Sequence, residues 1–273
     1  MFSVVILAFN EAKSLPACLE SLQRCDDIVV VDSGSTDTTA EIAQQAGARV
    51  VQHSFASFAR QRTFADRHTG LKYPWVFHLD ADERFTPELF DECQAWGNPE
   101  HLDGAYAAPR MLMQGKWLRR STDYPVYQAR FVHRERFRWI DVGHGQREAP
   151  EMRMAKLKSD YLHDFFVGGE DAWLKKHEDY ARQEAELSLR DSTRSSSDWQ
   201  DLSSRDPLRR RRALKRLSAS LPARPILRFI YQYFLRGGFL DGKVGWRYCH
   251  LLATYEGFSV KARKNARKVK ARP

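Results

Sequence analysis

The chain has 273 residues, of which 42% are hydrophobic, and a formal net charge of +9 at pH 7. This length favours one large domain or a domain with an appendage, and the hydrophobic fraction suffices for a core. No stretch reaches the ~18–20 apolar residues of a membrane span, and the opening MFSVVILAFNE lacks the basic start and cleavage site of a signal peptide. We therefore expect a soluble or peripheral protein. Four scattered cysteines without a CxxC pair indicate reduced thiols of a cytoplasmic protein.

The positive charge is concentrated in the C-terminal quarter. From Arg205 onward there are 19 Lys and Arg against 3 Asp and Glu, a net charge of +16. The preceding residues carry 25 against 32, a net charge of −7. This asymmetry predicts a polyanionic partner for the tail, either nucleic acid or an anionic membrane surface.

Strand and helix patterns alternate through the first part of the chain. The segments that predict strands are SVVILAF (3–9), DIVVVD (27–32), ARVVQ (48–52) and WVFHLD (75–80). A helix is predicted in SLPACLESLQRC after Ser14 as N-cap, and another in TTAEIAQQA, which Gly47 would end. Strands that are apolar throughout and alternate with helices indicate an α/β fold with a mostly parallel sheet covered on both faces.

Carboxylates follow two of these strands. Asp80 and Asp82 are two residues apart, so in an extended strand both side chains would point to the same face and repel each other. A hard divalent cation such as Mg²⁺ or Mn²⁺ would relieve that repulsion. The simpler alternative is a solvated acidic strand end. Because ligands of such sheets bind beyond the carboxyl ends of the strands, we expect Phe9, Asn10 and Asp32 to share one crevice with this pair.

The pattern changes after about residue 100, where aromatic and basic strand-like pieces precede a predicted helix in EDAWLKKHEDYARQEAELSL (170–189). The Ser-rich stretch RDSTRSSSDWQDLSS reads as a linker. Arg then alternates with bulky apolar residues. We therefore predict a catalytic domain over 1–190, a polar linker over 191–207 and a basic amphipathic helical region over 208–273.

Several segments, in this order, resemble glycosyltransferase family 2. The nucleotide-sugar segments correspond to SVVILAFNEAKSLPACLESL, VVVDSGSTDTTAEIA and VFHLDADER, and YQARFV, REAPE and YLHDFFVGGEDAWLKKHEDYARQEA resemble later blocks of the non-processive bacterial lipopolysaccharide-core glucosyltransferase type. The resemblance implies the GT-A fold with a basic helical C-terminal extension. It also implies an inverting, metal-dependent transferase that moves a single hexose from a UDP-sugar to a lipid-linked or cell-envelope saccharide acceptor.

The resemblance also implies site residues. Nucleotide-sugar binding would fall to Phe9, Asn10, Glu11, Asp32, Gln61, Arg62, Asp80, Gln128 and Arg130. The metal, Mg²⁺ or Mn²⁺, would be bound by Asp82 with Asp80 and His163. For four of these residues a structural role is the alternative: core packing for Phe9, turn formation for Asp32, a solvated helix face for Arg62 and a structural histidine at His163.

A separate carboxylate is needed as the base, because an inverting transfer requires a group that takes the proton of the attacking hydroxyl. The segment WIDVGHGQREAPE offers Asp141 and Glu148. Glu148 is favoured because it matches the His-Glu segment of the resembling subgroup, although Arg147 stands in place of the His.

The expected partners are a UDP-sugar donor, a saccharide or glycolipid acceptor and an anionic membrane surface. Membrane contact would come from the C-terminal region, with Phe229, Ile230, Tyr233 and Phe234 in the interface, and would place the protein on the inner face of the bacterial plasma membrane. No nucleic acid is expected, because the acidic body would repel a phosphate backbone. Two alternatives stay open, a basic-tailed nucleic-acid-binding protein and a catalytically inactive GT-A scaffold.

Overall fold

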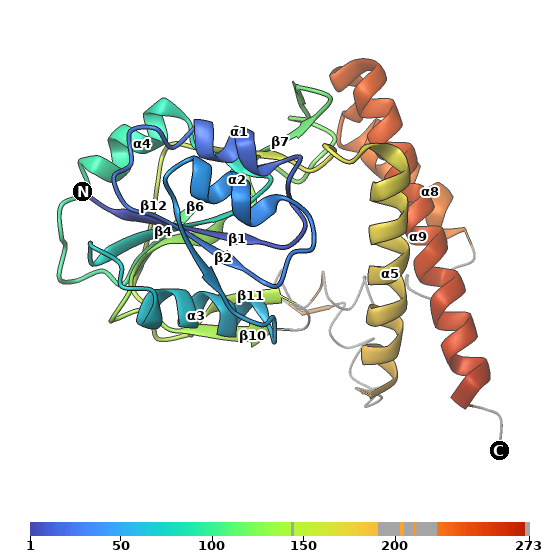
Figure 1. Ribbon diagram of the computed structural model, residues 1–273. Coiled ribbons are helices and arrows are strands. Elements are labelled where there is room, and N and C mark those ends of the chain that lie inside the picture. The colour runs from blue at the N-terminus through green and yellow to red at the C-terminus, as the bar shows by residue number, and fades with distance from the viewer. Residues whose placement is uncertain (143–144, 191–202, 205–209, 211–222, 271–273) are drawn as a thin grey trace. The chain divides into compact units, whose positions relative to one another are not determined.

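The computed structural model describes residues 1–142, 145–190, 203–204, 210 and 223–270 (Figure 1). The chain divides into two compact units, which are described separately. Residues 1–117 and 123–167 form an α/β unit. Residues 118–122 and the described residues from 168 onward form a helical unit. This division differs from the predicted boundary at residue 190.

A seven-stranded sheet in the order β12-β6-β9-β4-β1-β2-β3 forms the centre of the α/β unit. Its strands are β1 (Ser3–Ala8), β2 (Ile28–Asp32), β3 (Arg49–Gln52), β4 (Trp75–Asp80), β6 (Gly104–Ala107), β9 (Gln128–His133) and β12 (Met154–Lys156). Strands β1 to β4 pair in parallel, whereas β9 runs antiparallel to both of its neighbours. The expected mostly parallel sheet is therefore confirmed.

The apolar runs of the strands supply the core on both faces of this sheet. In β1, Val4 and Ile6 pack in one hydrophobic cluster, whereas Val5 and Leu7 pack in another. Side chains of a strand alternate between the two faces of its sheet. Both sets are buried here, so the strands show no alternation of apolar and polar residues.

Helices cover the two faces of the sheet. They are α1 (Leu15–Glu20), α2 (Thr39–Gln45), α3 (Phe58–His68) and α4 (Pro87–Gln94). Helices α1, α2 and α4 lie on one face and α3 on the other (Figure 1). Ser57 caps α3 by accepting a hydrogen bond from the Arg60 N–H at 3.2 Å. Helix α1 begins after Ser14 as predicted, although the Ser14 side chain makes no capping bond, and Gly47 follows α2 with a φ of +81°.

Two smaller sheets complete the α/β unit. A four-stranded sheet has the order β5-β13-β7-β8, and β10 and β11 form a hairpin. The bounds are β5 (Glu83–Arg84), β7 (Pro109–Met113), β8 (Lys116–Trp117), β10 (Trp139–Val142), β11 (Gly145–Glu148) and β13 (Tyr161–Asp164). Pairing of β13 with β5 sets His163 opposite Glu83, although they are far apart in the sequence.

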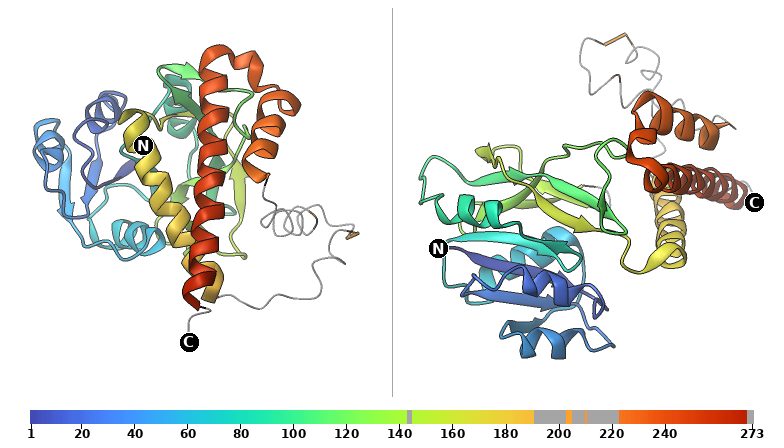
Figure 2. Two further views of the ribbon diagram at one scale, coloured as in Figure 1. Left: turned by 90° about the vertical axis from the view of Figure 1, so that its right-hand side faces the viewer. Right: turned by 90° about the horizontal axis from the view of Figure 1, so that it is seen from above.

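The helical unit contains α5 (Gly169–Arg190), α8 (Arg224–Ile230), the π-helical turn η1 (Tyr231–Leu235), the 3₁₀ turn η2 (Gly238–Asp241) and α9 (Gly242–Lys270). Helices α5 and α9 run side by side (Figure 1 and Figure 2). The His177 ring lies 5.2 Å from that of Tyr255, and Arg247 forms an ion pair with Glu170 at 2.6 Å. This packing explains why α5, assigned to the catalytic domain from sequence, groups with the C-terminal helices.

A short segment from before β9 is tied into the helical unit. The Asp241 carboxylate accepts hydrogen bonds from the backbone N–H groups of Arg120 and Ser121 at 3.0 and 2.7 Å. Gln232 donates to the Ser121 carbonyl at 2.5 Å. Most of the predicted linker over 191–207 lies outside the described residues. Of the helices described, none is long and apolar enough to cross a membrane.

Candidate functional site

The carboxyl ends of three parallel strands bring several predicted site residues to one edge of the sheet. Asp32 pairs in register with Ala8, immediately before Phe9 and Asn10, and Asp80 pairs with Leu7. The sheet topology therefore gathers the predicted nucleotide segments at one edge, where ligands of open α/β sheets bind.

The loop after β1 is held in a fixed shape by the loop after β2. Asn10 has a left-handed φ of +55°, and its Oδ1 accepts a hydrogen bond from the Thr36 N–H at 2.8 Å. The Glu11 N–H donates to Thr39 Oγ1 at 2.8 Å. Phe9 is 57% exposed, so it is not part of the core.

Asp32 is fully buried at the end of β2. Its two carboxylate oxygens accept hydrogen bonds from the Ser35 N–H at 3.2 and 3.1 Å, and one also accepts from the Ser35 hydroxyl. In this structure Asp32 therefore organises the turn that carries Ser35, which in turn accepts a bond from the Asn10 N–H at 2.9 Å.

Asp80 lies between two arginines. Its Oδ1 is 2.8 Å from Arg62 Nη2, and its Oδ2 is 3.1 Å from Arg130 Nη2. Burial alone would raise the pKa of Asp80, but Arg130 and Arg62 lower it well below its usual range. The group is therefore a carboxylate over the whole physiological range.

The two arginines differ in how many of their donors are used. Arg130 donates to Asp80, Glu83 and Gln128 and also to the His78 carbonyl and the Tyr161 hydroxyl. Arg62 is fully buried and bonds Asp80, while its Nε and Nη1 groups have no partner among the described residues. An unsatisfied buried N–H costs about 1–3 kcal/mol. Arg62 therefore has two guanidinium nitrogens, with three N–H groups, left for an added acceptor.

The expectation that Asp80 and Asp82 share one strand face is wrong. Strand β4 ends at Asp80, and Asp82 lies in the turn that leads to β5. The turn changes the direction of the chain, so the Asp82 Oδ2 lies 3.2 Å from His163 Nε2 instead of joining the Asp80 carboxylate between the two arginines.

The Asp82–His163 pair is surrounded by negatively charged side chains. Burial would lower the pKa of His163, but the carboxylates of Asp82, Glu83 and Asp80 raise it to about 9. Within the described residues, no group of three or more His, Cys, Asp or Glu side chains is arranged to hold a metal ion by itself. The side chains that could supply donors at this point are Asp82 and His163, and the Glu83 Oε1 lies 3.7 Å from His163 Nδ1.

Gln61 is buried beside the same strand ends. Its amide donates to the Ser33 hydroxyl at 3.0 Å and to the His53 carbonyl at 2.9 Å, and its Oε1 lies 2.7 Å from His53 Nδ1. In this structure it braces the strand ends from within the unit.

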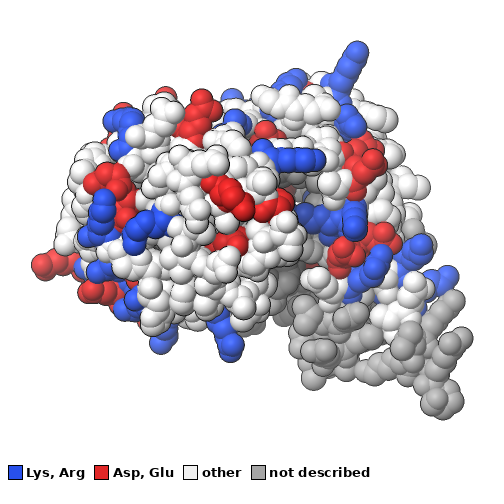
Figure 3. Space-filling model, in the orientation of Figure 1, with Lys and Arg blue, Asp and Glu red and all other residues white. Residues whose placement is uncertain are grey.

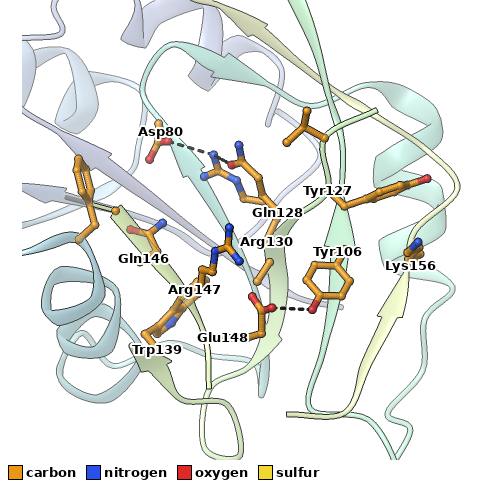
Figure 4. A pocket seen from close by; sticks show the side chains of 14 residues that line it. Asp80, Tyr106, Tyr127, Gln128, Arg130, Trp139, Gln146, Arg147, Glu148 and Lys156 are labelled. Atoms are coloured by element: carbon orange, nitrogen blue, oxygen red, sulfur yellow. Dashed lines mark hydrogen bonds and ion pairs between the residues drawn. The ribbon is translucent and has the colours of Figure 1, made fainter. Parts of the chain in front are cut away.

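A cavity of about 580 Å³ extends from Asp80 across the ends of β4, β9 and β11 (Figure 4). It is lined by Phe58, Asp80, Tyr106, Val126, Tyr127, Gln128, Ala129, Arg130, Trp139, Gly145, Gln146, Arg147, Glu148 and Lys156. Two predicted functions, donor binding at Asp80 and proton removal at Glu148, thus fall in the same cavity.

The two candidate bases have different surroundings. Glu148 faces the cavity, and its Oε1 accepts a hydrogen bond from the Tyr106 hydroxyl at 2.8 Å (Figure 4). Burial and this bond raise the pKa of Tyr106 to about 12, so the phenol stays a donor. Asp141 does not line the cavity and accepts a bond from Ser57, the cap of α3, at 3.0 Å.

Sequence patterns missed part of this site. Tyr106 and Lys156 lie on segments without a motif, and the pairing of β12 with β6 sets them side by side at the cavity. Tyr127 begins the YQARFV segment but was not itself expected in the site. Trp139 also lines the cavity, and its Nε1 donates to Asp66 at 3.0 Å.

Comparison with known proteins places this architecture in a family. The model of "Glycosyl transferase family 2" matches residues 3–147, more than half of the chain. The lipopolysaccharide core biosynthesis glycosyltransferase LpsC of Rhizobium meliloti is 40% identical over 109 residues, which are 34% of this chain and 40% of that protein. The PGL/p-HBAD biosynthesis glycosyltransferase of Mycobacterium bovis is 37% identical over 94 residues, covering 30% and 36% of the two chains. The matches thus span well under half the length of these relatives.

Solved structures give a weaker likeness. Glucosyl-3-phosphoglycerate synthase from Mycobacterium tuberculosis, in complex with Mn²⁺, UDP and glucosyl-3-phosphoglycerate, is 23% identical over 40% of this chain and 44% of that chain, with a TM-score of 0.34. The mostly parallel sheet with helices on both faces is the GT-A architecture expected from the sequence. Together with the family match over the nucleotide-sugar segments, this establishes that the chain belongs to glycosyl transferase family 2.

Proposed function

We propose that the protein transfers a single hexose from a UDP-sugar to a saccharide or glycolipid acceptor of the lipopolysaccharide-core type, with inversion at the anomeric carbon. The observation that supports this most directly is the shared cavity, which holds Asp80 at the donor end and Glu148 beyond it. Such a transfer needs a leaving diphosphate on one side of the sugar and a base on the other.

The donor nucleotide fits the edge formed by the loops after β1 and β2. Exposed Phe9 offers an apolar face to a base, and Asn10 and Glu11 belong to the braced loop beside it. Asp32 can accept the uracil N3–H once its bonds to Ser35 are exchanged. Each of these residues was expected from the sequence to bind the nucleotide.

Arg62 is assigned as the hydrogen-bond donor to the diphosphate. Its Nε and Nη1 groups are buried without an acceptor, and a guanidinium binds phosphate oxygens with its planar fork. Arg130 is already saturated by protein oxygens, so we assign it, with Gln128, to holding Asp80 and Glu83 in place. Gln61 supports the same strand ends from inside.

Mg²⁺ or Mn²⁺ would fit the donor set of Asp82 and His163, with Asp80 nearby, and the cation would take the place of the proton that these carboxylates favour on His163. A carboxylate oxygen and an imidazole nitrogen leave most of a hard cation's positions to diphosphate oxygens and water. A cation bound there would neutralise charge on the leaving diphosphate. The structural relative named above contains Mn²⁺ and UDP together, which is compatible with this assignment.

Glu148 is assigned as the base. Tyr106 donates to its Oε1, and its Oε2 has no hydrogen-bond partner among the described residues. As the acceptor oxygen bonds to the anomeric carbon, its proton passes to Oε2, and the bond from that carbon to the diphosphate oxygen breaks with its electron pair on the diphosphate. A single displacement of this kind inverts the configuration.

The helical unit supports the proposed membrane association. Its exposed apolar surface consists of Ile226, Leu227, Ile230, Tyr231, Phe234, Leu235, Phe239, Leu240 and Trp246. Most of these recur at helical spacing along α8 and η1, so they form a stripe. Soluble proteins seldom expose so much contiguous apolar area without a partner. Of the aromatics expected at the interface, Phe229 and Tyr233 instead stack on each other at 5.3 Å and are half-buried.

Basic residues accompany that stripe. Arg228, Arg236 and Lys243 lie within the same segment, and a cation near an anionic bilayer contributes about 1 kcal/mol. Apolar side chains with adjacent positive charge suit the interface of an anionic membrane. We therefore propose peripheral attachment through the helical unit.

The test of the donor site is a panel of UDP- and GDP-sugars with and without Mn²⁺ or Mg²⁺. UDP with the metal should raise the melting temperature more than either alone, because each completes the binding site of the other. Asp82→Asn should abolish this synergy in calorimetry. Asp91→Asn makes the same change at an exposed position of α4 and should leave the synergy between UDP and the metal intact.

Two results would overturn the assignment. Metal-dependent UDP binding that survives Asp82→Asn would remove the metal from this pair. Binding of UDP without any turnover of a donor sugar, over the whole acceptor panel, would favour the inactive scaffold.

A further inference from the structure

The charges that line the cavity do not cancel. Arg130 is paired with Asp80 and Glu83, and Glu148 is bonded by Tyr106. The other two cations of the lining, Arg147 and Lys156, form no ion pair with any residue that the structure describes. The outer part of the cavity therefore has two cations against the single carboxylate of Glu148, a net positive charge.

These two cations flank the assigned base. Figure 4 shows Glu148 and Tyr106 between Arg147 and Lys156. Arg147 precedes Glu148 on β11, and Lys156 ends β12, which pairs with β6 at Tyr106. A molecule whose hydroxyl reaches Glu148 is thus within the field of both cations.

The remaining lining is suited to a sugar ring. Lys156 Nζ lies 4.6 Å from the centroid of the Tyr127 ring, and Trp139 is held in place by Asp66. Aromatic faces with a few placed polar groups are typical of small-molecule sites, and Gln146 adds an amide to this wall.

We propose that the acceptor is an anionic saccharide, whose carboxylate or phosphate group is bound by Arg147 and Lys156 while its hydroxyl faces Glu148. This inference rests on the proposed transferase function and adds to it the chemical class of the acceptor. Arg147 offers a planar fork that matches either anion, and Lys156 offers a point charge.

The test measures binding of three monosaccharides to the full chain with UDP and diamagnetic Mg²⁺ present, by ligand-observed NMR titration. Glucose 6-phosphate and glucuronate carry the two kinds of anion, and glucose carries none. At least one anionic sugar should bind about 10-fold or more tightly than glucose. The stronger of the two identifies the anion as phosphate ester or carboxylate.

Substitutions locate the effect. Arg147→Gln and Lys156→Gln should each lower the affinity for the anionic sugar by about 5- to 10-fold and leave the affinity for glucose unchanged. Arg147→Lys should restore part of the loss. Lys158→Gln is the matched control, because Lys158 is exposed two residues further along and does not line the cavity.

The outcomes separate this proposal from the function on which it rests. Failure of wild-type protein to bind UDP would contradict the donor assignment, whatever the sugars do. Two results, each with normal UDP binding, would overturn the anionic acceptor alone. One is equal affinity for all three sugars. The other is an affinity for the anionic sugars that the Arg147→Gln and Lys156→Gln double variant leaves unchanged.

Discussion

The two units of this protein place charged and apolar side chains in opposite ways. The α/β unit buries ionisable groups, with Arg62, Arg130 and Glu83 almost inaccessible around Asp80. The helical unit instead leaves large apolar side chains in water, with Leu235 75% exposed. Figure 3 shows Lys and Arg interspersed with Asp and Glu over the face of the α/β unit that it displays, without a continuous basic stripe.

This difference indicates two kinds of partner. Burying charges costs free energy unless they are paired, and such arrangements are concentrated where a ligand's charge must be handled. Exposing apolar surface is also unfavourable, and it is relieved when a lipid or protein covers it. The α/β unit is thus suited to a small polar ligand and the helical unit to an apolar surface.

The largest expected effect concerns the base of the α/β unit. Glu148→Gln keeps the shape and the bond from Tyr106 but removes the proton acceptor, so turnover should fall by about 100-fold or more. Donor affinity should stay nearly unchanged, as measured by calorimetry with UDP and Mn²⁺. Asp141→Asn is the matched control and should retain most activity. If Asp141→Asn is inactive and Glu148→Gln turns over normally, the base is Asp141.

The next effect concerns the exposed apolar surface. Replacing Leu235 and Leu240 together by Ser should reduce co-sedimentation with phosphatidylglycerol vesicles by about 30-fold, because each partly inserted leucine gains about 1 kcal/mol on leaving water. The variant should unfold like the wild type, since both side chains are exposed. Unchanged partitioning, combined with loss of a dimer in light scattering, would show that a second copy covers this surface.

A smaller effect is expected from the buried polar contacts of the cavity wall. Trp139→Phe removes the N–H that donates to Asp66 and leaves a buried carboxylate oxygen unsatisfied, which should lower the free energy of unfolding by about 1–2 kcal/mol. Trp96→Phe is the control, because the Trp96 Nε1 has no hydrogen-bond partner among the described residues. Equal losses in urea titrations of the two variants would show that the hydrogen bond contributes nothing.

The smallest effect concerns pH. Burial would raise the pKa of Asp27, but hydrogen bonds from Ser3, Lys72 and Arg49 lower it overall. A lowered folded-state pKa adds stability above the unfolded value of about 3.9, and that stability is lost as pH falls through the folded-state value. In urea titrations at several pH values, the free energy of unfolding of Asp27→Asn should therefore fall less between pH 5 and pH 3 than that of the wild type. Identical slopes would mean that other carboxylates dominate.

Much of the α/β fold was predictable because its signals are local. The runs ending at Ala8, Asp32 and Asp80 are apolar throughout, and each is followed by turn or helix signals. The contacts within the site were less predictable. Arg62 was expected to bind the nucleotide-sugar, with a solvated helix face as the alternative, yet its burial against Asp80 depends on how α3 packs on β4.

By itself, the sequence determined the order of the first strands and helices, the common edge for Phe9, Asn10, Asp32 and Asp80, the family and the basic character of the C-terminal region. These follow from periodicity, turn residues and short motifs, which act over a few residues. Only the tertiary structure decided that Asp82 turns toward His163, that Tyr106 holds Glu148, that Lys156 reaches the same cavity and that α5 packs with α9. Those contacts join residues far apart in the chain, and their geometry is set by strand pairing and helix packing, for which no local pattern exists.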